Sequence, residues 1–179
     1  DGGYYNNWDF STNLSKNYLN VLSKTSVDVI EIGFRKPISN IGSGPSGLKK
    51  IGKFLISEDK FLSSLNIPEN KQISVMIDLS DYAGHDGYEK LKKNFGKSKN
   101  TVVNMVRIAC NYNDKKNLGK VVRYLKSKNY IVCANLMKFT ILNNNQILSF
   151  FKFALKSGAT YLYLADSFGN CLPSKIKNI

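Results

Sequence analysis

The sequence is poor in histidine, arginine and cysteine, and its 179 residues contain one, three and three of them, respectively. A single histidine, His85, cannot form a histidine cluster by itself. An odd number of cysteines without Cys-x-x-Cys spacing argues against a disulfide framework and favours a reducing compartment, so we expect a cytoplasmic protein. No apolar run approaches the ~18 residues of a membrane span, and no secretory signal is visible, so we expect no membrane partner.

Lysine, in contrast, is abundant, and 26 Lys and Arg face 13 Asp and Glu, for a net charge of +13. Such a surplus would ordinarily indicate nucleic acid or an anionic membrane as a partner. Only Arg35, Arg107 and Arg123 are arginines, whereas recognition of bases and phosphates favours the guanidinium group. Because the lysines are scattered among many asparagines, we predict a solvated lysine surface and no nucleic-acid partner.

The hydrophobic content of 42% is sufficient for one sizeable core, and apolar runs alternate with helical patterns. The runs cover residues 27–34, 73–79, 102–109, 130–137 and 161–165, and the first is rich in β-branched residues, as in a strand buried on both faces. Helical patterns cover residues 14–22, 57–65, 118–125 and 147–155, and a short one begins near residue 88. The last strands start about thirty residues apart, the length of one βα unit. The sequence therefore predicts an α/β fold with a parallel sheet, either closed as a barrel or open.

Each predicted strand carries one polar or charged residue near or just past its C-terminal end. These residues are Glu31, Asp78, Arg107, Asn135 and Asp166. Burying such groups is unfavourable unless they are paired or bind a ligand. In a (β/α)₈ barrel, the active site lies at this end of the strands. Structural roles stay open for several of them: an ion pair between Glu31 and Arg107, a loop cap by Asp78, and backbone hydrogen bonding by Asn135.

Residues 1–10 (DGGYYNNWDF) join a carboxylate and two glycines to a cluster of aromatic and amide side chains. The glycines let the backbone turn sharply and pass close to other groups. This stretch resembles the Asp-Gly-Gly end of the Arg-Asp-Gly-Gly signature of the DRE-TIM metallolyases, the HMG-CoA lyase-like or pyruvate carboxyltransferase superfamily, and above all its 4-hydroxy-2-oxovalerate aldolase-like branch. The run from Tyr130, with SGATYLYLADSFGN near its end, is similar to the fifth and sixth strands of the ketoacid aldolases. Together these resemblances span nearly the whole chain.

The resemblance implies a (β/α)₈ TIM barrel. Residues 1–179 would then form a single partial catalytic domain that holds about the first six βα units and is truncated at both ends, because such a barrel typically needs about 250 residues. The family's metal-binding histidine pair and the arginine of its signature would lie outside this stretch. Cys110, Cys133 and Cys171 are expected to be packing residues.

The resemblance also implies roles for individual side chains. Asp1 matches the family's metal-binding aspartate. Tyr4 or Tyr5 stands where the family has a histidine, and the phenol of Tyr4, the predicted catalytic residue, would donate a proton or a hydrogen bond to a carbonyl group. Arg107 would be the second catalytic residue and would orient the substrate. Ser167 matches the serine that contacts the bound ketoacid. The remaining predicted substrate-binding residues are Asn7, Glu31, Asn135 and Asp166.

The implied function is that of a divalent-metal-dependent carbon–carbon lyase or aldolase, acting on a 2-oxo acid or acyl substrate through a metal-stabilised enolate. An oxygen-rich set of ligands favours Mg or Mn. One alternative is a non-catalytic barrel relative that serves as a binding or assembly subunit. A nucleotide-binding open sheet is less well supported, because the glycines of residues 42–47 lack the Gly-x-Gly-x-x-Gly arrangement and the P-loop ending. Self-association into a homo-oligomer stays open.

Overall fold

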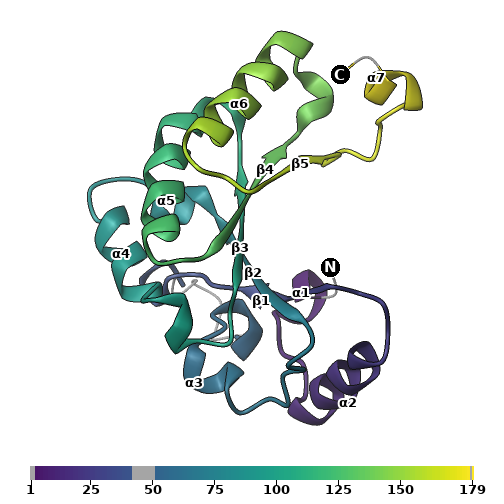
Figure 1. Ribbon diagram of the computed structural model, residues 1–179, viewed down its shortest axis with the longest axis vertical. Helices are drawn as coiled ribbons and strands as arrows, with labels where there is room; N and C mark the ends of the chain where they lie inside the picture. Colours follow the sequence, from purple (N-terminus) through teal and green to yellow (C-terminus); the bar gives the residue numbers. More distant parts are fainter. Residues whose placement is uncertain (1–2, 42–50, 178) are drawn as a thin grey trace.

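The computed structural model of the protein describes residues 3–41, 51–177 and 179 (Figure 1). Five parallel strands form one sheet, and strands that follow one another in the chain are neighbours in space. They are β1 (Val29–Phe34), β2 (Gln72–Asp78), β3 (Met105–Cys110), β4 (Ile131–Met137) and β5 (Tyr161–Ala165). The predicted parallel α/β fold is confirmed, and within the described residues the sheet is open.

Helices precede β1, lie in the connections between the strands and follow β5. The longer ones are α2 (Thr12–Ser23), α4 (Gly87–Asn94), α5 (Lys115–Ser127) and α6 (Asn144–Lys156), and the short ones are α1 (Gly3–Asn6), α3 (Asp59–Leu62) and α7 (Pro173–Lys177). Single turns of 3₁₀-helix lie at Ile38–Asn40, Lys53–Leu55, Leu79–Tyr82, Ser98–Asn100, Tyr112–Asp114 and Phe139–Ile141. No helix among the described residues has both the length and the apolar character needed to cross a membrane.

Local side chains set several of the helix ends. Ser11 caps α2 by accepting a hydrogen bond from the backbone N–H of Leu14 at 3.2 Å. At the start of α6, Asn143 and Gln146 form a reciprocal capping box. Gly158 follows the end of α6 with φ of +104°, a conformation that favours glycine, as the sequence predicted.

One predicted helix is much shorter than expected. The pattern over residues 57–65 yields only α3, because the Ser64 hydroxyl donates to the carbonyl of Phe61 at 2.7 Å and so competes with helix continuation.

The core lies between the sheet and the helices α4, α5 and α6, which cover one face of it (Figure 1). Strand register aligns the aliphatic side chains of this face: Val75 pairs with Val106, and Val106 with Val132. All three are fully buried. Each such side chain stabilises the fold by about 1.5–3 kcal/mol.

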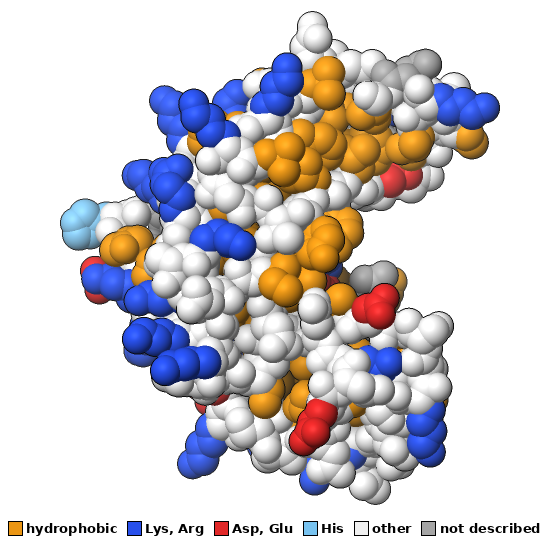
Figure 2. All heavy atoms as spheres, in the orientation of Figure 1, with side chains coloured by type: hydrophobic (Ala, Val, Ile, Leu, Met, Phe, Trp, Pro, Cys, Tyr) orange, Lys and Arg blue, Asp and Glu red, His pale blue; other side chains and the backbone are white. Residues whose placement is uncertain are grey.

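The opposite face of the sheet is the open face. Its register lines run Met76, Arg107, Cys133, Tyr161 and, one step toward the C-terminal ends, Asp78, Ala109, Asn135, Tyr163. Figure 2 shows the molecule hollowed on this side. The open face therefore carries most of the polar residues that interrupt the apolar strands.

Helix α2 forms as predicted, but much of its apolar face stays exposed. Leu14, Tyr18 and Val21 are 58–61% exposed, whereas the buried residue of this helix is Leu19. No element of the described chain covers this stripe, which lies beside the free edge of β1.

Candidate functional site

The opening segment has a tightly defined shape. Gly3 lies under the indole of Trp8, and a Cβ on it would approach the ring to 2.3–2.5 Å. The backbone N–H of Trp8 donates to the carbonyl of Gly3 and to the side chain of Asn6, both at 3.0 Å. Asn7 and Trp8 both adopt left-handed conformations, with φ of 54° and 62°, which is unfavourable for a bulky aromatic residue. Such a backbone persists only where its surroundings hold it.

Gly52 holds this turn from a distant part of the chain. Its N–H donates to the carbonyl of Asn7 at 2.8 Å, and a Cβ on Gly52 would lie 1.7 Å from the carbonyl oxygen of Trp8. Asn7 thus contributes its backbone to the turn, and its side chain forms no hydrogen bond with the described residues. Its predicted substrate contact stays a prediction. Asp1, the predicted metal ligand, lies outside the described residues.

An aromatic cluster attaches this segment to the C-terminal end of β1. The ring centroids of Trp8 and Phe34 are 5.1 Å apart, and Tyr4 packs edge-on against both at 5.6 and 6.3 Å. The Tyr4 side chain is still 65% exposed. Its pKa lies above the ordinary phenol value, because partial burial outweighs the positive charge of Arg107. Tyr4 is therefore a protonated phenol at neutral pH.

Glu31 and Arg107 form a two-pronged ion pair across the open face. The Nε and Nη2 atoms of Arg107 donate to the two carboxylate oxygens of Glu31 at 2.6 and 2.5 Å. This hydrogen bonding raises the pKa of the guanidinium. The Nη1 atom of Arg107 has no hydrogen-bond partner among the described residues. The structural alternative is thus confirmed as a contact, and Glu31 orients Arg107 while one edge of the guanidinium stays free.

Asn135 is a buried amide with a poor partner. The residue is only 3% exposed, and the one hydrogen bond of its side chain within the described chain runs from Nδ2 to the Sδ atom of Met137 at 3.5 Å. The expected alternative, a hydrogen bond to neighbouring backbone, does not form. A buried amide that meets only a thioether is unfavourable, so this position is suited to a ligand or a water molecule.

Ser74 is a functional-site candidate that the sequence did not reveal. Its hydroxyl is buried without a hydrogen-bond partner, and its register neighbours are Glu31 and Met105. A serine inside the apolar run 73–79 gives little signal, because a small hydroxyl is common in strands. Its position on the open face became evident only from the strand register.

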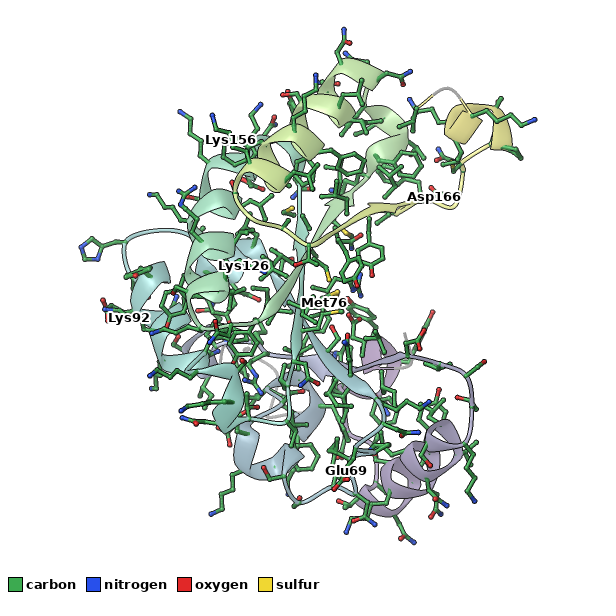
Figure 3. All side chains as sticks on the ribbon, viewed as in Figure 1. Glu69, Met76, Lys92, Lys126, Lys156 and Asp166 are labelled. Carbon is green, nitrogen blue, oxygen red and sulfur yellow. The ribbon has the colours of Figure 1, made fainter. Side chains whose placement is uncertain are left out.

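Asp166 and Ser167 lie just beyond β5, and both bond to the backbone. The Asp166 carboxylate accepts from the N–H groups of Cys171 at 2.8 Å and Asn170 at 3.2 Å, which lowers its pKa. The Ser167 hydroxyl accepts from the N–H of Lys138 at 2.9 Å and thereby joins the ends of β4 and β5. Figure 3 labels Asp166 at this end of the sheet. Substrate binding by these two side chains stays a prediction.

Asp78 has the capping role that the sequence allowed for it. Its carboxylate accepts from the N–H and the hydroxyl of Ser80 at 2.9 and 2.8 Å. Asp78 therefore fixes the turn after β2.

Two hollows border the open face. One, of about 500 Å³, lies along the free edge of β1 and reaches Tyr4, Met76 and the Glu31–Arg107 pair. The other, of about 920 Å³, lies at the N-terminal ends of the strands, with Asn104 and Tyr161 in its lining. Parallel α/β sheets place their chemistry at the C-terminal ends of the strands, so the first hollow is the better candidate.

A solved structure is similar to this chain over almost its whole length. It is the crystal structure of the N-terminal domain of a putative aldolase from Bacteroides vulgatus, with a TM-score of 0.77 and 27% sequence identity. The match covers 99% of this chain and 55% of that one. The fold is aldolase-like. No protein-family model matches the chain, and no curated protein matches it.

The described residues do not by themselves supply the ligands of a metal ion. Among them, no three or more His, Cys, Asp or Glu side chains come together in a group that could hold one. On the open face, Glu31 is engaged by Arg107, and Asp78 by Ser80. The predicted metal therefore rests on Asp1 and stays a prediction.

Proposed function

We propose that this chain is part of an aldolase-type carbon–carbon lyase that acts on a 2-oxo acid or a related acyl substrate. The observation that carries the proposal is the pairing, on one face of an aldolase-like fold, of an arginine locked by a carboxylate with a buried amide that lacks a good partner. Both groups donate hydrogen bonds, and a 2-oxo acid presents a carboxylate and a ketone oxygen that accept them.

The chemistry follows from these donors. In the cleavage direction, the hydroxyl group on the second carbon from the ketone loses its proton to solvent, and that carbon leaves as a carbonyl compound when its bond to the carbon next to the ketone breaks. The electron pair of the broken bond becomes an enolate, so negative charge develops on the ketone oxygen. Donors that are already oriented toward this oxygen stabilise the transition state more than the ground state. The free edge of Arg107 would bind the carboxylate, and Nδ2 of Asn135 would bind a substrate oxygen.

Tyr4 is suited to one direction of proton transfer. A phenol carries its proton at neutral pH, and the raised pKa of Tyr4 further disfavours the phenolate that a general base would need, so the hydroxyl can only donate to a developing anion. Tyr4 would therefore serve as the general acid rather than the base.

We include a divalent metal, Mg or Mn, with Asp1 as one of its ligands. When bound, such an ion would act as a Lewis acid toward a carbonyl oxygen of the substrate.

We further infer that the sheet belongs to a closed (β/α)₈ barrel. Exposed apolar side chains accompany both of its outer strands: Leu14 and Tyr18 on α2 beside β1, and Leu148 and Leu155 on α6, the helix that leads into β5. Uncovered apolar surface next to unpaired strand edges is unfavourable in an isolated unit. In a closed barrel, further strands and helices would cover both.

The test is the exchange of pyruvate methyl protons with deuterated solvent, followed by NMR on the full-length protein with and without Mg or Mn. Metal-dependent exchange that is lost in Asp1→Asn would support the whole proposal. Exchange that persists after chelation and in Asp1→Asn would support the lyase activity and contradict its dependence on a metal. Absence of exchange with pyruvate and with larger 2-oxo acids would contradict the lyase.

A non-catalytic binding subunit is the second candidate. The observation in its favour is that Asp166 and Ser167 are already occupied by backbone N–H groups. Saturable binding of a 2-oxo acid without proton exchange would support this alternative.

A further inference from the structure

The charge of this protein is unevenly distributed along its chain. Residues 115–165 contain nine Lys and Arg and no Asp or Glu, whereas residues 1–114 contain twelve of the thirteen carboxylates. Lysine is frequent in both parts, with thirteen in residues 1–114 and ten in the remainder. A general bias toward lysine therefore does not explain the asymmetry, which comes from the absence of carboxylates.

The fold collects these cations on the outer surface of α5 and α6, away from the open face. On α5 they recur at i, i+4 and i+7, and on α6 at i and i+4, all exposed to solvent. We call this set the basic ridge: Lys116, Lys120, Arg123, Lys126, Lys152 and Lys156. Lys126 reaches the turn between α6 and β5, where its Nζ lies 3.5 Å from the hydroxyl of Thr160. Figure 2 shows Lys and Arg along this side, and Figure 3 labels Lys126 and Lys156 on it.

On the neighbouring helix α4, in contrast, lysines are neutralised by carboxylates of the same chain. There, Lys90 pairs with Asp86 at 2.9 Å and Lys92 with Glu89 at 2.5 Å. Within the described residues, no cation of the basic ridge forms an ion pair. Like charges at i and i+4 weaken a helix, so the ridge is unfavourable for the isolated chain. An external anion would relieve it.

We propose that the basic ridge is a docking surface for an acidic helix of a partner protein. Cations at i, i+4 and i+7 are spaced about 6 and 4.5 Å apart along the axis, since an α-helix rises about 1.5 Å per residue. A partner helix with Glu at i, i+4 and i+7 repeats these distances. The carboxylates would face the Lys and Arg side chains along α5.

Two observations favour a protein over a nucleic acid. Five of the six cations of the ridge are lysines, whereas phosphate and base recognition favours arginine. The aromatic side chains of α5 and α6 are buried or half-buried, so none is presented for stacking against bases. The ridge also lies on the helical side of the sheet, so docking there is independent of the proposed lyase activity.

The experiment compares two synthetic helical peptides of identical composition on the full-length protein. One carries Glu at i, i+4 and i+7 on one face, and the other distributes the same residues around the helix. We expect the striped peptide to bind about tenfold more tightly, with affinity that falls as salt is added, as for other charge-complementary contacts. Equal binding of the two peptides, or no binding, would overturn the proposal.

Matched charge reversals locate the contact. The triple variant Lys120→Glu, Arg123→Glu, Lys126→Glu should lose binding of the striped peptide. The control Lys16→Glu, Lys24→Glu, Lys60→Glu changes the net charge equally, from +13 to +7, at α2, α3 and their ends, and should keep the affinity within about twofold. The neutral triple with Gln at positions 120, 123 and 126 should fall between them, and melting curves check that all three fold.

Equal losses in the ridge and control triples would mean that only net charge matters and would overturn the assignment of the surface. Tighter binding of duplex DNA or of anionic lipid vesicles than of the striped peptide would also overturn it.

Discussion

The two faces of the sheet come from the same five strands and differ in whether their side chains carry polar groups without hydrogen-bond partners. On the helix-covered face, Val75, Ile108 and Val132 are fully buried and have no polar group to satisfy. On the open face, Ser74 and Asn135 are buried polar groups with no partner or a weak one, and Arg107 presents a free edge. One face therefore stabilises the fold, while the other retains unused hydrogen-bonding groups, and binding or chemistry is expected on that second face.

Truncating one side chain on each face is the strongest test of this difference in packing. Ile108→Ala should lower the free energy of unfolding by about 2–5 kcal/mol, because a cavity forms in a fully packed core. Met76→Ala on the open face should cost less, because Met76 is only partly buried. Urea denaturation of both variants measures the difference. Similar losses would mean that the open face is packed as tightly as the core.

Arg107 tests the chemical side of the comparison. Arg107→Gln should reduce kcat/KM about 10²-fold, ~2.7 kcal/mol, mainly through a higher KM, because it removes the charge that binds the substrate carboxylate. Arg123→Gln, on the outer surface, is the matched control and should leave kcat/KM unchanged. Steady-state kinetics with 2-oxo acids measures both, and an unchanged kcat/KM in Arg107→Gln would exclude the binding role of Arg107.

Asn135 should separate stability from activity. Asn135→Leu replaces a buried amide with a side chain of similar size, so we expect stability to be unchanged or raised by about 1 kcal/mol while activity falls. Thermal melts and turnover are measured on the same preparation. A marked loss of stability would show that the amide is satisfied in solution and is structural.

The smallest expected effect is a change of stability at alkaline pH, and it comes from the cysteines of the two faces. Burial raises the pKa of Cys110, beneath the helices, to about 12 and that of Cys133, on the open face, to about 11, against an ordinary value of 9.0. Because the folded-state pKa values are raised, these thiols do not lower the free energy of unfolding below pH 9.0. That free energy falls as the pH rises from 9.0 toward about 12, because the thiols of the unfolded chain ionise first.

Stability should therefore decline across this alkaline range, and Cys110→Ala should make the decline shallower. Denaturation at several pH values measures the slope. Thiol labelling should modify the partly exposed Cys171 before Cys133 and Cys110. Early labelling of Cys110 would contradict the assigned burial.

The strands were predictable because each is a short, mainly apolar run, and β2 and β4 agree with their predicted ranges to within a residue at each end. What periodicity could not show is what covers a helix. The stripe of Leu14, Tyr18 and Val21 marks an apolar face correctly, yet the described chain leaves it exposed.

The candidate site was partly predictable, because a charged residue in an apolar strand is a strong signal, as for Glu31 and Arg107. Their two-pronged geometry, and the weak partner of Asn135, depend on side-chain positions that no spacing rule reports. Ser167 is a further case. The ligand contact that its sequence context implies stays a prediction, and nothing in the sequence indicated that its hydroxyl accepts a hydrogen bond from the left-handed backbone of Lys138.

The contact between Gly52 and the Asn7–Trp8 turn has a consequence for the order of folding. Two successive left-handed residues are held by backbone atoms more than forty positions away in the sequence. The opening segment therefore cannot adopt its final conformation before residues 52–55 pack against β1. Closing so long a loop has an entropic cost that must be overcome before the contact stabilises the turn. We therefore expect the Trp8 indole to reach its native environment no earlier than residues 52–55 dock against β1.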